Sequence, residues 1–243
     1  MPDPQPEVIS ADASSRSDSY FRIKVGSRVN WTVAHVEKKM GSDTLEATLA
    51  NTTFAGVKGL WSSSRVDCLS LERTFDFNFM TYECVPVGKD TPRQVAKIAR
   101  FEWEIPYITH ETEVYRHLEG SDIARRFLGH LFENGRPMGF LLEYVEGQFA
   151  GIHDLDKCKA VLERFHQLGW VHGDVNRYNF IINNDRACLI DFGNSQKSDC
   201  AEKMATEMMA LSDKLRDESR LGAPFGAYED GDDGETSSND DEQ

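Results

Sequence analysis

The chain has 243 residues, of which 40% are hydrophobic and 28% are charged, so it can bury one sizeable core or two small lobes around a cleft. A formal net charge of -14 speaks against a nucleic-acid-binding protein held by phosphate contacts. The five cysteines are scattered and form no C-x-x-C pair, so they indicate neither a zinc site nor a disulfide framework.

Residues 1–19 are rich in Pro, Ser and Asp and predict an unstructured arm. They contain neither the basic segment nor the apolar core of a secretory signal. No apolar run in the chain approaches the roughly 20 residues that a membrane-spanning helix needs. Together with the cysteine pattern, these features favour a cytosolic or nuclear protein without a membrane partner.

Residues 20–61 contain alternating pieces such as "FRIKV" and "VNWTVAHV", which predict short strands but no site. Farther on, "FMTYECVPV" and "RQVAKIARFEW" flank the sequence "GKDTP". Gly88 and Pro92 suit a turn, so this stretch predicts a hairpin.

The sequence "ITHETEVYRHL" predicts a helix, because Val114, Tyr115 and Leu118 recur at helical spacing after a candidate Thr109 cap. A second hairpin is expected from "FLGHLF" and "MGFLLEYV", which are joined through the turn dipeptide Asn134-Gly135.

After Gly147 the pattern changes from strand to helix. A first helix is predicted by one apolar stripe, and a further hairpin by "YNFIIN" and "ACLIDF". A last helix should end near Gly222 and Pro224. The first stripe consists of Leu155, Cys158, Leu162 and Phe165, and the second of Met204, Met208, Leu211 and Leu215.

Residues 225–243 predict a disordered acidic tail, because such a segment buries too little apolar surface to offset its ordering entropy. The sequence leaves open whether the tail keeps the protein in solution or docks a basic protein partner. From Leu221 onward there is no Lys or Arg, and the acidic residues are Glu229, Asp230, Asp232, Asp233, Glu235, Asp240, Asp241 and Glu242.

The stretch "WVHGDVNRYNF" places polar residues between bulky apolar ones. His172, Asp174 and Asn179 give the pattern H-x-D-x-x-x-x-N, and Asp191 begins a D-F-G sequence on the next predicted strand. In these motifs the chain resembles the protein-kinase-like superfamily. The resemblance extends over roughly residues 79–195.

The resemblance implies a role for each of these residues. Asp174 would accept the proton of a hydroxyl group, while Asn179 and Asp191 would bind magnesium at the phosphates of ATP. His172 and His166 are expected to be structural. Phosphoryl transfer depends on positioning and on hard oxygen ligands, which is why an amide and carboxylates suit it.

The same resemblance assigns two upstream groups. Lys97 in "QVAKI" would bind the α- and β-phosphates and be held by Glu111, which fits the helix pattern better than Glu113. The sequence "GFLLEYVEG" is similar to the hinge between kinase lobes. Contacts to the nucleotide are then implied for Val95, for Leu142 as gatekeeper, for the Glu143 carbonyl and for the Val145 amide.

The expected fold is therefore α+β, a two-lobed protein-kinase-like fold with a sheet-rich N-lobe over residues 20–145 and an abbreviated helical C-lobe over residues 146–224. H-G-D, with Gly173, resembles the atypical branches: aminoglycoside phosphotransferases, RIO kinases and the small kinase of the KEOPS complex. The short C-terminal part resembles the last two more. Glu207 stands where the KEOPS-type kinase has an acidic residue.

One departure from the family concerns the loop that covers the phosphates. No glycine occurs between Leu60 and Val87, so a Gly-rich cradle of backbone amides is missing, and "LERTFDFNF" is expected in its place.

The sequence thus predicts an ATP- and magnesium-dependent phosphotransferase acting on a hydroxyl acceptor, which is either a protein or a small molecule. The alternative is a pseudokinase scaffold that binds a partner.

Overall fold

A six-stranded sheet forms the centre of the protein, which we describe from a computed structural model. The structure describes residues 5–13, 18–38, 45–184 and 186–225, without the side chains of 35–51. The edge strand β5 pairs parallel to its neighbour and the other pairs are antiparallel. In spatial order the strands are β5 (Arg65–Asp67), β9 (Phe127–Glu133), β10 (Arg136–Glu143), β8 (Gln94–Ile98), β7 (Thr81–Pro86) and β6 (Leu71–Asp76).

The two faces of this sheet bury different clusters, because side chains alternate along a strand. On β8, Val95 joins the cluster that includes helix α1 (Ile105–His117), and Lys97 faces the same side. Ala96 and Ile98 point the other way, into a second cluster. A strand buried on both faces therefore carries the lysine at the centre of the fold.

Both predicted hairpins of the sheet are confirmed. β7 and β8 pair on either side of a turn in which Gly88 has a φ of 68°, and β9 and β10 pair through Asn134 and Gly135 with φ of 49° and 81°. Two successive positive φ angles are those of a tight hairpin turn that favours Asn-Gly.

Helix α1 begins earlier than its sequence pattern suggests. Its first residue is Ile105, with Pro106 in the first turn, so Thr109 lies inside the helix and does not cap it. The Thr109 hydroxyl instead accepts a hydrogen bond from the Lys58 backbone N–H at 3.1 Å. Pro starts a helix readily because its fixed φ is already helical and it lacks an N–H that would go unpaired there.

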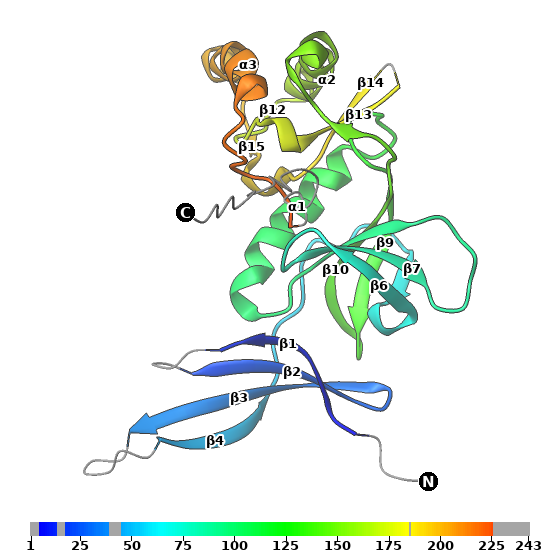
Figure 1. Cartoon of the computed structure of the whole chain (residues 1–243), viewed down its shortest axis with the longest axis vertical. Helices are drawn as coiled ribbons and strands as arrows, with labels where there is room; N and C mark the ends of the chain where they lie inside the picture. Colours follow the sequence, from blue (N-terminus) through cyan, green and yellow to red (C-terminus); the bar gives the residue numbers. More distant parts are fainter. Residues whose placement is uncertain (1–4, 14–17, 39–44, 185, 226–243) are drawn as a thin grey trace, which may run out of the picture.

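A separate antiparallel sheet lies below the central one (Figure 1). Trp31 of this sheet belongs to the same buried cluster as Ala96 and Ile98 of the central sheet, so the two sheets share this cluster. The prediction that residues 1–19 are unstructured is wrong for Glu7–Asp12, because this segment forms a strand that pairs with Ser19–Val25. The strands are β1 (Glu7–Asp12), β2 (Ser19–Val25), β3 (Arg28–Lys38) and β4 (Leu45–Thr52).

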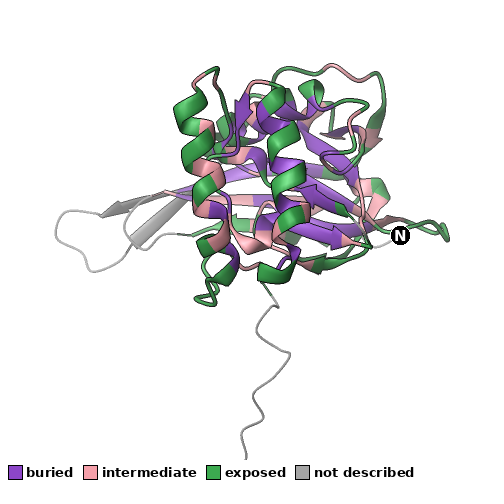
Figure 2. Ribbon diagram, turned by 90° about the horizontal axis from the view of Figure 1, so that it is seen from above, coloured by how far each residue is buried: buried purple, intermediate pink, exposed green. Residues whose placement is uncertain are grey.

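Helices α2 (Leu155–Gln167) and α3 (Ala201–Arg216) and the short strands between them form the part drawn at the top of Figure 1. The predicted amphipathic helix is α2, whose Cys158, Leu162 and Phe165 are buried. Viewed from this end, the helices expose their outer faces over buried strands (Figure 2). The short strands here are β11 (Gln148–Phe149), β12 (Trp170–Val171), β13 (Phe180–Asn183), β14 (Arg186–Leu189) and β15 (Gln196–Lys197).

The last helix, α3 (Ala201–Arg216), ends earlier than predicted. Leu211 and Leu215 are buried, as the apolar stripe indicates. Residues 217–225 follow α3 without forming a helix and turn toward the central sheet. The acidic tail lies outside the described residues, apart from Phe225. In the described part of the chain, none of the helices combines the length and apolarity that crossing a bilayer requires.

Candidate functional site

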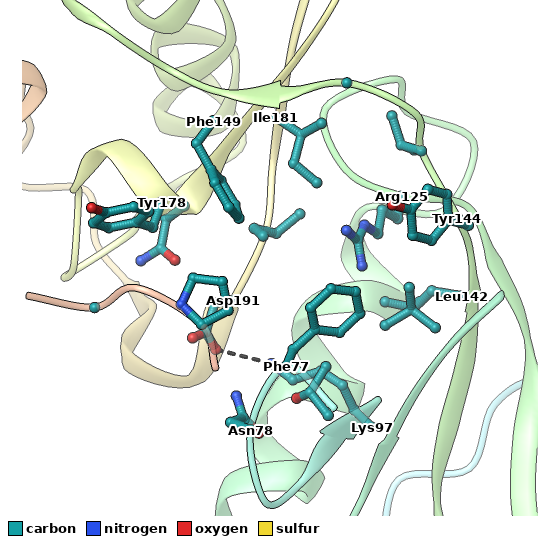
Figure 3. A pocket seen from close by; sticks show the side chains of 18 of the residues that line it. Phe77, Asn78, Lys97, Arg125, Leu142, Tyr144, Phe149, Tyr178, Ile181 and Asp191 are labelled. Carbon is teal, nitrogen blue, oxygen red and sulfur yellow. Dashed lines mark hydrogen bonds and ion pairs between the residues drawn. The ribbon is translucent and has the colours of Figure 1, made fainter. Parts of the chain in front are cut away.

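Three charged residues that are far apart in the sequence meet at one point. Lys97 lies on β8, Glu111 on α1 and Asp191 just after β14. The Lys97 Nζ atom is 2.8 Å from Glu111 Oε1 and 2.9 Å from Asp191 Oδ1. The sequence predicts this convergence, and the contact to Asp191 is drawn in Figure 3.

The two carboxylates keep the lysine charged. Burial alone would lower the pKa of the Lys97 ammonium, but Asp191 and Glu111 raise it above its ordinary value. Lys97 in turn holds the pKa of the Asp191 carboxyl below its ordinary value. The site therefore presents an ammonium group and the Asp191 carboxylate side by side at neutral pH.

The backbone at Asp191 is fixed by its neighbours. Asp191 has φ 62° and ψ 69°, a left-handed conformation that Asp tolerates better than most residues. The next N–H, of Phe192, donates to Glu111 Oε1 at 3.2 Å, and the Phe192 ring is fully buried against Tyr115 and Phe165. Glu111 thus orients both the lysine and the D-F-G turn.

The H-x-D-x-x-x-x-N segment brings its Asp and Asn together. The Asn179 side-chain amide donates to the Asp174 carbonyl at 2.8 Å, while the Asn176 amide donates to Asp174 Oδ1 at 3.2 Å. Asp174 is exposed and Asn179 is buried. Because Nδ2 of Asn179 is turned to the loop, its Oδ1 is the atom left for a ligand.

A cavity of about 360 Å³ lies between the central sheet and the C-terminal part, and neither Asp174 nor Glu111 lines it. Lys97, Asn179 and Asp191 line it. At the other end the predicted hinge residues Val95, Leu142 and Val145 also line it.

Glu143 does not lie on this wall. Its carboxylate accepts hydrogen bonds from the Arg126 backbone N–H and side chain, and it borders a second cavity instead. Tyr144, which belongs to the quoted hinge sequence, and Arg125, which lies in none of the quoted motifs, line the hinge end of the first cavity.

The turn between β6 and β7 covers the cavity, as the sequence predicts for "LERTFDFNF". Phe75, Phe77 and Asn78 line it. The backbone N–H groups of Phe77 and Asn78 donate to the Thr81 carbonyl, and the Met80 N–H donates to the Asn78 side chain. These amides are already used inside the turn, in contrast to the free amides of a Gly-rich loop.

The residues after α3 cover the other side of the cavity. Gly222 to Phe225 line it, and the Phe225 N–H donates to the Phe77 carbonyl at 2.7 Å. The Phe225 ring packs edge-on against Phe79, with 5.1 Å between centroids. The sequence offers no signal for this contact, because it joins two loops by one backbone hydrogen bond and one ring pair.

Comparisons with known proteins agree with this geometry. Residues 143–212 match the family model of the RIO domain. In this part the chain is therefore similar to an atypical protein-kinase-like domain.

One curated protein and one solved structure are similar to parts of the chain. Lipopolysaccharide core heptose(II) kinase WaaY of Escherichia coli is 35% identical over 83 residues, which are 31% of this chain and 34% of that protein. The chain therefore spans about a third of the length of this curated relative. The solved structure of the Cydia pomonella granulovirus kinase PK-1 is similar over 53% of each chain, with 18% identity and a TM-score of 0.40.

The oxygen atoms of the kinase-like site fit a magnesium ion. The Asp191 side chain is 51% exposed and, like Asn179, lines the cavity. Among the described residues no group of three or more His, Cys, Asp or Glu side chains forms a self-sufficient metal site. Magnesium is commonly held by one or two protein oxygens together with phosphates and water, so this pair suits it.

His172 is structural, in line with the sequence prediction. Its side chain is buried against Phe192 and its Nε2 atom donates to the Ile190 carbonyl at 3.0 Å. Burial lowers the pKa of the imidazole, so the ring stays neutral and holds the segment before Asp191 in place.

Glu207 of α3 anchors the loop that carries Asp174. Its carboxylate accepts hydrogen bonds from the backbone N–H groups of His172 at 3.0 Å and Gly173 at 2.6 Å, and from His166 Nε2 at 2.7 Å. Burial opposes the charge, but these donors lower the pKa of the Glu207 carboxyl below its ordinary 4.5. α3 thereby fixes the position of the loop.

Replacing Glu207 tests this anchor. Because the folded pKa is lowered, the ionised carboxylate stabilises the fold above pH 4.5, and this contribution is lost as pH falls through the lower folded pKa. We expect Glu207→Gln to reduce the free energy of unfolding by about 1.5–3 kcal/mol at pH 7 and by less at pH 3. Urea unfolding at both pH values measures this, with the exposed Glu218→Gln as control. An equal loss at the two pH values would contradict the anchor.

Proposed function

We propose that the protein is a phosphotransferase that moves the γ-phosphoryl group of a nucleoside triphosphate, ATP in the family it resembles, to a hydroxyl acceptor with the help of Mg²⁺. The convergence of Lys97, Glu111 and Asp191 carries this proposal, together with the cavity that Lys97, Asp191 and Asn179 line. The RIO-domain match and the kinase relative support it.

Each residue has a separate task in this proposal. Lys97, oriented by Glu111, binds phosphate oxygens, and Asp191 with Asn179 holds the metal ion. When bound, the ion neutralises charge that develops on the phosphates. Asp174 accepts the proton as the acceptor O–H bond breaks; that oxygen bonds to phosphorus while the bond to the leaving nucleoside diphosphate breaks.

The chemical class of the hydroxyl acceptor has two candidates. The name of WaaY suggests a sugar hydroxyl, whereas the RIO likeness suggests a protein hydroxyl. A screen of sugars and proteins with labelled nucleotide separates the two classes. We further propose lobes that divide near Val145, and a cytoplasmic or nuclear location that the scattered cysteines favour.

A pseudokinase scaffold is the second candidate, and one observation favours it. The covering turn uses its own backbone N–H groups, so fewer donors remain for phosphates. A thermal shift assay with ATP and Mg²⁺ separates the candidates, since a ligand at 100 times its dissociation constant stabilises the folded state by about 2.7 kcal/mol. The absence of any shift at millimolar nucleotide would favour the scaffold.

Asp174→Asn should separate binding from transfer. The exposed Asp174 side chain is not among the residues that line the nucleotide cavity, so nucleotide affinity should stay within about twofold of the wild type. Transfer should fall by about 100-fold or more, because a general base contributes at least that factor. Turnover with the best acceptor of the screen, measured beside the thermal shift, tests both. A variant that transfers at the wild-type rate would remove Asp174 from its role.

A further inference from the structure

Arg125 is a buried cation for which the described residues supply neither a hydrogen-bond nor an ion-pair partner. It lies in the segment between α1 and β9, next to Ala124, which forms a bridge to Leu189 of β14. The residue is 8% exposed. In the described part of the chain its guanidinium forms neither a hydrogen bond nor an ion pair, and its Nε atom is fully buried without a partner. Its nearest aromatic contact is loose, with 6.0 Å to the Tyr144 ring centroid.

An arrangement of this kind is costly unless a ligand completes it. Burying a polar group without a hydrogen bond costs several kcal/mol in an apolar setting, and a charge costs more. Arginine has five N–H donors and no acceptor, so whatever satisfies it must bring acceptor atoms.

The Arg125 side chain lines the same cavity as Lys97, but it lies at the end opposite to the proposed phosphate site. Figure 3 shows the guanidinium beside Tyr144 and Leu142, while Asp191 and its contact to Lys97 lie across the ring of Phe77. With the triphosphate at Lys97, the base of a bound nucleotide would lie at the hinge, beside Arg125.

The walls at this end suit a flat base better than a free anion. Val95, Leu142 and Val145 are apolar, and the Tyr144 and Phe77 rings flank the space. Pockets of mostly apolar walls with one well-placed polar group are typical of small-molecule recognition, where the polar group sets specificity.

Adenine and guanine differ at the edge that an arginine reads. Guanine offers two neighbouring acceptors, O6 and N7, which match the guanidinium fork, whereas adenine offers N7 beside an amino group that is itself a donor. We propose that Arg125 binds the O6 and N7 atoms of guanine, so that GTP is the preferred phosphoryl donor of this site. This inference rests on the proposed function and names its nucleotide.

Binding of GTP, ITP and ATP, each with Mg²⁺, tests the proposal by titration calorimetry on the whole chain. ITP has the O6 and N7 edge of guanine but lacks its 2-amino group. We expect GTP and ITP to bind about tenfold or more tightly than ATP, the range that a bidentate arginine contact gives. Arg125→Met should remove this preference by weakening GTP and ITP while leaving ATP within about twofold.

Two further variants keep the result interpretable. Arg126→Met is the matched control, because this neighbouring arginine is exposed, pairs with Glu143 and does not line the cavity. It should keep the GTP preference. Arg125→Lys keeps the charge but loses the fork, so it should lose most of the preference even if the methionine variant folds poorly.

The outcomes distinguish this inference from the function on which it rests. If ATP binds as tightly as GTP and ITP, the inference is overturned and the proposed function stands. If Arg125→Met tightens all three nucleotides alike, Arg125 blocks the cavity and the inference is again overturned. If none of the three binds to the wild type, both proposals fail.

Discussion

Asp191→Asn should lower the proposed Mg²⁺-dependent phosphoryl transfer by on the order of 1,000-fold, because it removes the charge of the proposed metal-binding carboxylate and one of the two carboxylates beside Lys97. Asparagine is the right replacement at this position. The residue has a positive φ of 62°, which Asn adopts nearly as readily as Asp, whereas Ala would add backbone strain. The loss can then be attributed to charge.

Two measurements accompany this variant. Unfolding in urea should show a stable protein, because Lys97 keeps its ion pair with Glu111, at 2.7 Å. Raising the Mg²⁺ concentration should not restore the rate. Asp199→Asn, at an exposed position, is the control and should retain full turnover. Wild-type turnover in Asp191→Asn would refute the assignment of this residue to the metal.

Lys97, Glu111 and Asp191 meet, and Asn179 lines the same cavity as Lys97 and Asp191, because each belongs to a motif with fixed spacing. Asp174, Asn179 and Asp191 lie on one loop–strand–strand unit, and the lysine precedes its helix by a short connection. Arg125 belongs to no such motif. Only its burial without a hydrogen-bond partner among the described residues marks it as a candidate binding residue. Burial and pairing are properties of the tertiary structure, and composition does not contain them.

The same contrast holds for the secondary structure. Hairpins with a strong turn dipeptide, such as Asn134-Gly135, are specified locally. Strand β1 is not, because Glu7–Asp12 is polar at its ends and gains its order from pairing with β2. The early end of α3 has a related cause: after Leu215 the apolar stripe stops, and the following residues contact the β6–β7 turn instead.

Breaking the ion pair between Arg22 and Glu133 should cause the largest loss of stability. Arg22 of β2 and Glu133 of β9 have side chains only 6% and 0% exposed, and two hydrogen bonds join them, one of 3.1 Å from Nε. Arg22 also donates to Ser10 Oγ on β1 at 3.2 Å. Arg22→Met or Glu133→Leu leaves one buried charge without its partner, which costs about 3–5 kcal/mol.

A double-mutant cycle shows whether the pair itself is responsible. Combining Arg22→Met with Glu133→Leu removes both charges, so the double variant should be much more stable than the sum of the single losses implies. Arg216→Met, which removes an exposed pair with Asp213, is the control and should cost no more than about 1 kcal/mol. Urea unfolding curves of the wild type and of the four variants measure these losses. Additive losses of unfolding free energy in the cycle would mean that the two side chains act separately. The ion pair would then not be the interaction that holds the β1–β4 sheet against the central sheet.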